Sequence, residues 1–302
     1  MSRPTIPSIS PRQPSHHRWL RILARGAALA ALAALTACGS SSPPADTTPA
    51  AAPAAAEPAA AATPAAPREV SEVSVPAEIR ALVDAADRAP EDRALDAGRK
   101  PGELLAFAGV HAGMKVGEIA AAGGYTTEFL ARAVGPTGAV YAENSKGLIG
   151  FVGPAWDKRL ARPAMKPAVR VDRELDDPLP PEAKDLDAVF IVLFYHDLYW
   201  IKSDRDKMNA AIFAALKPGG IYVVVDHSAA QGAGDSQVKT LHRIEESVVR
   251  ADVEKAGFRL IETGGFLRNP ADARDWNASP MAAGPKRGTS DRFVLKFEKP
   301  AK

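Results

Sequence analysis

The chain has 302 residues, of which 46% are hydrophobic and 25% are charged, so it carries enough apolar material for a folded core. Its single cysteine excludes an internal disulfide. The formal net charge of +2 becomes 2 − 5 = −3 without residues 1–37, which hold five arginines and no acid, so electrostatics give no indication of a nucleic-acid partner.

Residues 1–37 are predicted to be an export signal. The apolar run GAALAALAALTA after Arg25 is much shorter than the ~20 residues that cross a bilayer. It ends in LTAC, which resembles the lipobox of bacterial lipoprotein precursors, where cleavage precedes the cysteine and the thiol receives a lipid. The resemblance implies a lipoprotein signal peptide, lipidation of Cys38 and a protein of the bacterial cell envelope, anchored to a membrane by its lipid and facing the periplasm. The alternatives are an ordinary signal-peptidase site nearby or a cysteine without a role.

Residues 38–74 are predicted to be a lipid-anchored disordered linker. From Gly39 to Pro67 the chain is almost entirely Ala, Pro, Ser and Thr, a composition that cannot bury enough surface to offset its ordering entropy. The remaining residues, 75–302, fit one α/β domain better than two.

The first half of this domain is expected to begin with helices and then to alternate. Apolar spacing predicts helices at AEIRALVDAADRA (77–89), PGELLAFAGV (101–110) and TTEFLARAV (126–134), the last with Thr126 or Thr127 as N-cap. Short apolar runs predict strands at MKVGEIAA (114–121), GAVYAEN (138–144) and KPAVRVDREL (166–175).

The second half continues the alternation. LDAVFIVLFYHD (186–197) and IYVVVDHS (221–228) are typical of buried parallel strands, and FRLIETGGF (258–266) is a further strand. Helices are expected at SDRDKMNAAIFAAL (203–216) and LHRIEESVVRADVEKAG (241–257), and the alternating RFVLKFEK (292–299) is typical of an antiparallel strand. The pattern predicts a doubly wound α/β sheet whose ligand lies at the carboxyl ends of its strands.

Several of these segments together resemble the class I S-adenosylmethionine-dependent methyltransferases. GMKVGEIAAAGGYTTEFLA (113–131) is similar to the first motif of that family, ALKPGGIYVVVD (215–226) to its fifth-strand signature, and the final strand to its antiparallel seventh. YHDLYW and DHSA are more closely similar to a group of predicted bacterial methyltransferases, often exported. The resemblance covers about residues 100–298 and implies a mostly parallel seven-stranded sheet of order 3-2-1-4-5-7-6, with S-adenosylmethionine as cofactor.

The resemblance also implies a cofactor-binding turn. The family has an acid followed by Gly-x-Gly-x-Gly, which places Glu118 on the acid and Ala120, Ala122 and Gly124 on the glycines, with Gly123 as a further flexible position. Alanine at a positive φ costs on the order of 1 kcal/mol, and its Cβ occupies space near the ligand. The alternative is a tight strand–helix turn that binds nothing.

Two further positions are implied for the cofactor. Glu143 and Asn144 end the second predicted strand, where the family binds the ribose hydroxyls, and the choice between them stays open. Asp177, with Asp172 and Asp176, follows the third strand, where the family contacts adenine. The alternative for these aspartates is a solvated turn.

The catalytic candidates follow the fourth strand. Tyr195, His196 and Asp197 come directly after a buried run, where many members of the family face the methyl group. A histidine beside a carboxylate is a suitable base for an oxygen or nitrogen acceptor, so His196 is the expected base. The alternative is a structural pair of His196 and Asp197.

A second polar group follows the fifth strand. Asp226, His227 and Ser228 invite comparison with a hydrolase, but adjacent residues rarely form a triad and no Gly-x-Ser-x-Gly elbow is present. His196, His227 and His242, together with Asp197 and Asp226, offer a possible set of metal ligands. Their wide separation and lack of helical ligand spacing favour a site without metal.

The sequence thus favours an S-adenosylmethionine-dependent methyltransferase acting on an unidentified small molecule or envelope acceptor. Two alternatives remain. One is a non-catalytic small-molecule-binding lipoprotein that keeps the fold, suggested because the donor is made in the cytoplasm. The other is a hydrolase that depends on histidine or metal.

Overall fold

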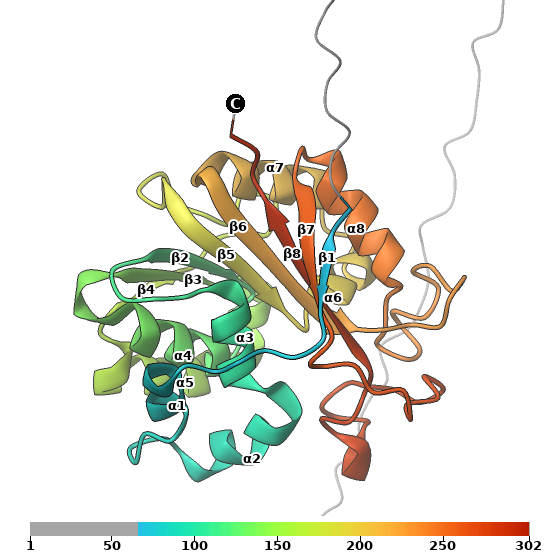
Figure 1. Ribbon diagram of the computed structural model, residues 1–302, viewed down its shortest axis with the longest axis horizontal. Helices are drawn as coiled ribbons and strands as arrows, with labels where there is room; N and C mark the ends of the chain where they lie inside the picture. Colours follow the sequence, from blue (N-terminus) through green and yellow to red (C-terminus); the bar gives the residue numbers. More distant parts are fainter. Residues whose placement is uncertain (1–65, 302) are drawn as a thin grey trace, which may run out of the picture. The chain divides into compact units, whose positions relative to one another are not determined.

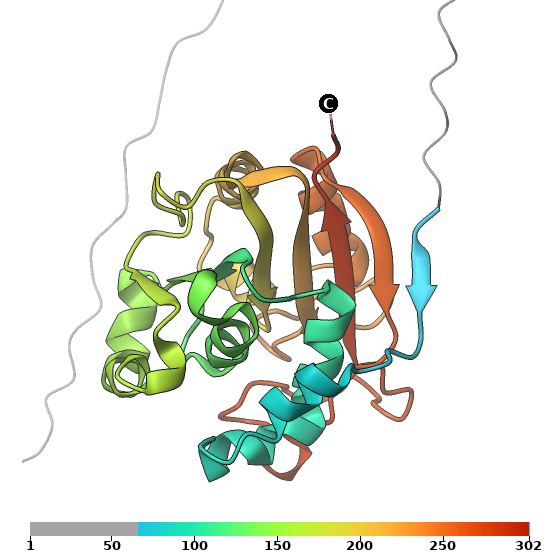
Figure 2. The same ribbon diagram turned by 60° about the vertical axis from the view of Figure 1, so that its left-hand side comes forward.

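The computed structural model describes residues 66–301, whose arrangement is seen in Figures 1 and 2. Cys38, the predicted signal peptide and most of the predicted linker lie outside the described residues. None of the described helices is long and apolar enough to cross a membrane.

One mixed sheet of eight strands organises this part of the chain, in the order β1-β7-β8-β6-β5-β2-β3-β4. The strands are β1 (Arg68–Val70), β2 (Lys115–Ile119), β3 (Ala139–Glu143), β4 (Ala168–Val171), β5 (Leu186–Val192), β6 (Leu216–His227), β7 (Arg259–Gly264) and β8 (Arg292–Glu298). The helices are α1 (Ala77–Val83), α2 (Pro90–Arg99), α3 (Pro101–Ala108), α4 (Tyr125–Val134), α5 (Lys146–Leu160), α6 (Tyr195–Trp200), α7 (Arg205–Ala215) and α8 (Glu246–Lys255).

The predicted fold class is confirmed. From β4 to β7 the strand order is the expected 3-2-1-4-5-7-6 arrangement, and β8 pairs antiparallel with both β6 and β7. The sheet has one strand more than predicted, because Arg68–Val70, assigned to the linker, pairs in parallel with Glu262–Gly264 at the edge (Figure 2). An ion pair between Arg68 and Glu262 adds to the backbone pairing.

Helices cover both faces of the sheet, as expected where parallel strands are apolar on both sides (Figure 1). Alternate residues of β5 point to opposite faces: Phe190 joins the core formed with α1, α3 and α4, while Ile191 joins the core formed with α6, α7 and α8. Burial on both sides fixes the register, since a shift by one residue would exchange the two faces.

Several helices differ from the predictions. The strand predicted at 186–197 stops at Val192, and its last residues belong to α6, which was not predicted. The helix predicted at 77–89 ends at Val83, and α2 begins after it at Pro90. Helix α5 was not predicted, although Ser145 caps its start by accepting a hydrogen bond from the Leu148 amide. The helix predicted at 241–257 begins only at Glu246, which leaves His242 in the preceding loop.

Candidate functional site

A cavity of about 580 Å³ lies at the carboxyl ends of β2, β5 and β6, where a doubly wound sheet is expected to bind its ligand. This volume is in the range of small-molecule sites. One end is formed by the turn after β2 together with α2, and the other by residues that follow β5 and β6. The residues that line the cavity include Arg99, Glu118, Ala120, Ala122, Gly123, Leu193, Asp197, Trp200, His227 and His242.

The turn after β2 has the backbone that the glycine pattern demands. Ala120 and Ala122 have φ of 55° and 50°, and Gly124 has φ of 76°. These are the three positions where the family has glycine. The alanines therefore adopt the left-handed conformation at some cost in strain, and their methyl groups form part of the cavity wall.

Gly124 is required for a second reason. A Cβ at this position would lie 2.4 Å from Cζ3 of Trp156 and 2.7 Å from Cδ of Arg159, both on α5. The backbone of the turn thus packs directly on this helix. At Gly123, by contrast, a Cβ would meet nothing within 4 Å.

The side chains of Glu143 and Asn144 do not line the cavity, but they hold the turn through hydrogen bonds with its backbone amides. Oε2 of Glu143 accepts a hydrogen bond from the amide of Ala120 at 2.9 Å, and Oδ1 of Asn144 accepts one from the amide of Ala122 at 2.7 Å. Both side chains are fully buried, and Oε1 of Glu143 has no hydrogen-bond partner among the described residues. Burial raises the pKa of Glu143 to about 8. The residues expected to bind ribose therefore hold the backbone of the turn, and Oε1 of Glu143 has no partner among the described residues.

An acidic and a basic side chain, Glu118 and Arg99, lie at the same end of the cavity. Glu118 is 3% exposed, and its Oε2 accepts a hydrogen bond from the hydroxyl of Thr127 at 2.5 Å. Burial raises the pKa of Glu118 to about 8, against the opposing effects of that hydrogen bond and of the Arg99 charge. The guanidinium of Arg99 lies 4.5 Å from the ring centre of Tyr125 and has no ion-pair partner within residues 66–301. Sequence reasoning missed Arg99, because it lies on a helix that precedes the motif.

The residues that follow β5 and β6 form the other end. His196 is fully buried and does not line the cavity, because its ring is held by Asp226: Nδ1 and Oδ1 are 2.7 Å apart. Asp226 also accepts hydrogen bonds from the amides of His196 and His227. Burial acts to lower the pKa of His196, but the attraction of the Asp226 carboxylate is stronger than this effect, so the pKa of His196 is raised above its usual value. Asp197 lines the cavity whereas His196 does not, and the role of His196 as a base stays a prediction.

Three histidines gather here although they lie far apart in the sequence. The ring centres of His196 and His242 are 4.0 Å apart, and those of His196 and His227 are 5.8 Å apart. Their closeness in space contradicts the expectation that residues so far apart in the sequence do not share a site. Burial lowers the pKa of His242 to about 4 and that of His227 well below its usual value, so both rings are neutral at neutral pH.

Backbone strain also concentrates at this cavity. Of the eight non-glycine residues with positive φ in the described part of the chain, four line it: Ala120, Ala122, Leu193 and His242. Such conformations persist where the surrounding structure enforces them, and they cluster at functional sites.

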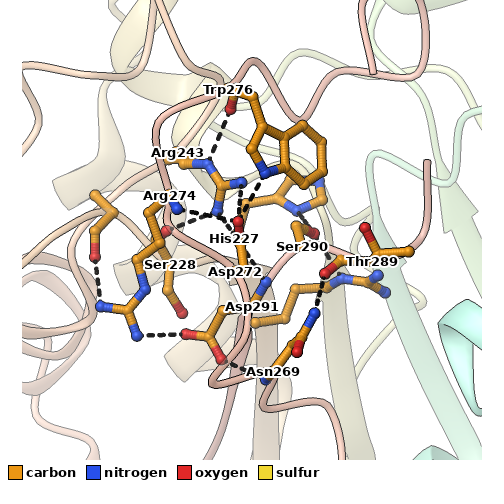
Figure 3. A network of polar contacts seen from close by, with 12 residues as sticks. His227, Ser228, Arg243, Asn269, Asp272, Arg274, Trp276, Thr289, Ser290 and Asp291 are labelled. Carbon is orange, nitrogen blue, oxygen red and sulfur yellow. Dashed lines mark hydrogen bonds and ion pairs between the residues drawn. The ribbon is translucent and has the colours of Figure 1, made fainter. Parts of the chain in front are cut away.

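A buried polar network fixes the loop that closes one wall (Figure 3). The guanidinium of Arg243 is fully buried and donates to both oxygens of Asp272, at 2.8 and 3.2 Å. Asp272 also accepts hydrogen bonds from Nε1 of Trp276 and from the amide of Asp291. Asn277 and residues 279–281 of the same loop line the cavity, so this network sets the position of the wall.

The remaining candidates lie elsewhere. Tyr195 is fully buried and accepts a hydrogen bond from Nδ2 of Asn209, away from the cavity. Asp177 is exposed and forms an ion pair with Arg173, as its alternative interpretation expected. Ser228 accepts a hydrogen bond from Arg268, and no histidine contacts its hydroxyl among the described residues, so the serine triad is not formed.

No protein-family model and no curated protein matches the sequence. Solved structures do match the fold. A structure described as a putative sarcosine dimethylglycine methyltransferase from Galdieria sulphuraria has a TM-score of 0.51 at 16% identity, over 72% of this chain and 90% of that chain. A SAM dependent methyltransferase from Aquifex aeolicus has a TM-score of 0.47 at 20% identity, over 69% and 96% of the two chains. The first likeness establishes a shared methyltransferase-type α/β fold, which does not by itself fix an activity.

Proposed function

We propose that this protein is an S-adenosylmethionine-dependent methyltransferase. The observation that carries the proposal is the cavity at the carboxyl ends of β2, β5 and β6, with the left-handed turn 120–124 and the charges of Glu118 and Arg99 at one end. The backbone at Ala120, Ala122 and Gly124 has the left-handed conformation that glycine adopts most readily, and the turn opens onto the cavity.

The two charges suit the amino-acid part of the donor. S-adenosylmethionine carries an ammonium and a carboxylate on one carbon. Arg99 offers a guanidinium to the carboxylate, and Glu118 offers a carboxylate to the ammonium. The ammonium would also favour ionisation of Glu118, whose pKa burial raises to about 8 in its absence.

The opposite end of the cavity suits the methyl acceptor. Methyl transfer from a sulfonium is an in-line displacement, so the acceptor must be held in line with the donor. Asp197, His227 and His242 supply polar contacts there, while Trp200 supplies apolar surface. A small acceptor with one polar group and an apolar body fits this lining.

The donor site is tested by calorimetric titration of the full-length protein with S-adenosylhomocysteine and, separately, with adenosine, which lacks the amino-acid part. Arg99→Met should weaken binding of S-adenosylhomocysteine by roughly tenfold or more and leave adenosine unaffected, since one charge-assisted contact is worth about 1.5–3 kcal/mol. Arg93→Met is the matched control: Arg93 lies on the same helix but binds the backbone oxygen of Ala85. Absence of binding at millimolar S-adenosylhomocysteine would refute the donor site.

Binding without transfer to any acceptor would favour the non-catalytic alternative. A radioactive methyl group on S-adenosylmethionine, followed into an extract of envelope small molecules, separates these outcomes. Transfer that is lowered by Arg99→Met but kept by the control Arg93→Met would support the enzyme.

We also propose that the chain is exported and anchored through lipid on Cys38, as the segment LTAC suggests. Cys38→Ser should release the protein from the membrane fraction of a bacterial host and abolish labelling by radioactive palmitate. An unchanged membrane fraction with no label in either protein would refute the anchor.

A further inference from the structure

We propose that His196, Asp197 and His242 form a binding site for one divalent transition-metal ion at the acceptor end of the cavity. The inference goes beyond the methyltransferase proposal, and it does not depend on which donor binds the other end.

The three side chains converge on one point. Each offers one ligand atom, and these atoms all lie within 4.8 Å of one another. Nε2 of His196 is 3.5 Å from Oδ2 of Asp197, and Nδ1 of His242 is 3.8 Å from Oδ1 of Asp197. Two ligands at about 2.1 Å from a tetrahedral ion lie roughly 3.4 Å apart, close to both distances.

These atoms are otherwise unpaired. Nε2 of His196 and Nδ1 of His242 are buried and have no hydrogen-bond partner among the described residues. The distances of both to Asp197 are too long for hydrogen bonds. Buried ring nitrogens without partners are costly, and an ion between the three side chains would satisfy both.

The surroundings are those of a metal ligand. Nδ1 of His196 lies 2.7 Å from Oδ1 of Asp226, and donation of its proton there leaves Nε2 with a free lone pair. Metal-binding histidines commonly donate their other ring proton to a carboxylate in this way. Asp226 is itself fixed by the amides of His196 and His227. His242 has a φ of 57°, so strained backbone holds its ring toward the group.

The donor set indicates the class of ion. Two imidazoles and one carboxylate suit Zn²⁺, Fe²⁺ or Co²⁺, whereas Mg²⁺ and Ca²⁺ prefer oxygen ligands. Asp197 and His242 line the cavity, so a position on the ion would remain open toward the acceptor. An ion there would lower the pKa of an acceptor hydroxyl that binds it, which removes the need for His196 as a base.

The site is tested with Zn²⁺ and Co²⁺ on the untagged full-length protein in which His16 and His17 are replaced by alanine, so that only four histidines remain. After chelation and dialysis, we expect one Zn²⁺ per chain by metal analysis and the visible absorption of Co²⁺ bound by nitrogen. His242→Asn tolerates the positive φ but removes the imidazole, and Asp197→Asn removes the carboxylate charge. Each should weaken Zn²⁺ binding by roughly tenfold or more, since outer-shell changes alone cost 10–100-fold.

His111→Ala is the matched control, because His111 is exposed and lies at the opposite ends of the strands, before β2. It should leave Zn²⁺ affinity unchanged. Thermal unfolding of each variant in chelator shows whether it is folded, and added Zn²⁺ should raise the Tm of the parent and of His111→Ala but not of the two ligand variants. The proposal is overturned if the parent binds no Zn²⁺ at tenfold excess, or if both ligand variants bind it as tightly as the parent. S-adenosylhomocysteine binding, measured in the same samples, reports separately on the donor site.

Discussion

The two alanines of the turn allow a direct test of its backbone. Ala120 and Ala122 have positive φ, whereas Ala121 between them does not. Left-handed backbone costs an L-residue about 1–2 kcal/mol, which glycine avoids, while glycine loses about 0.4–1 kcal/mol through the entropy of the unfolded chain. Ala122→Gly should therefore leave the free energy of unfolding unchanged or raise it by up to ~1.5 kcal/mol. Ala120→Gly also loses a buried methyl worth about 0.8 kcal/mol, so it should change that free energy by less than ~1 kcal/mol in either direction.

Ala121→Gly is the matched control in the same turn. Ala121 is buried, so its replacement loses a methyl worth about 0.8 kcal/mol in addition to the entropy. We expect this variant to be less stable by ~1–2 kcal/mol. Urea unfolding of the full-length proteins, compared by midpoint at unchanged slope, measures all three. Equal destabilisation by the three substitutions would show that positions 120 and 122 are not left-handed, and the argument for a glycine-type turn would fail.

Two further predictions concern the same turn. Gly124→Ala adds left-handed strain and an overlap with Trp156, so it should lower the free energy of unfolding by ~2–5 kcal/mol. Gly123→Ala should change that free energy little, because a Cβ there meets nothing within 4 Å. Equal effects of the two substitutions in urea unfolding would contradict the packing of the turn on α5. The pKa of Glu143 rises from 4.5 to about 8 on folding, so the native state holds this proton more tightly and stability falls as the pH rises from about 4.5 to 8. Glu143→Gln keeps an acceptor for the Ala120 amide but has no proton to lose, so it should remove up to roughly 4 kcal/mol of the pH-dependent loss of stability. If the free energy of unfolding varies with pH in the same way in this variant, Glu143 is not buried as described.

The fold could be predicted from the sequence because the patterns that indicate its strands and helices are local. Continuous apolar runs of four to eight residues predict buried parallel strands, and the alternation of RFVLKFEK predicts the antiparallel β8. The eighth strand was missed because Arg68–Val70 is three residues long and has no apolar pattern of its own. Its pairing with β7 depends on a neighbour almost 200 residues away in the chain.

The candidate site was predicted only in part, again because sequence signals are local. The end of the cavity beside the turn 120–124 includes one continuous motif, from which Glu118, Ala120 and Ala122 were predicted as site residues. Arg99 lines the same end but belongs to no motif, and only the packing of α2 beside the turn reveals it. A resemblance can identify residues that a motif contains, but it cannot identify a lone charge contributed by another helix.

The acceptor end shows why sequence spacing is a poor guide to shared chemistry in a doubly wound fold. His196 and Asp197 follow β5, while His242 lies 15 residues beyond the end of β6. Parallel strands bring their carboxyl ends to one edge whatever length of chain separates them, so residues that follow different strands meet there. Spacing argued against a metal because it tests only for ligands on one helix or one loop. His242 does not follow β6 directly: the pairing of Ser228 with Ile244 brings its loop back to the end of that strand, and no spacing in the sequence predicts this return. Asp226 at the end of β6 holds the ring of His196, so the same edge supplies the proposed ligands and the residue that orients one of them.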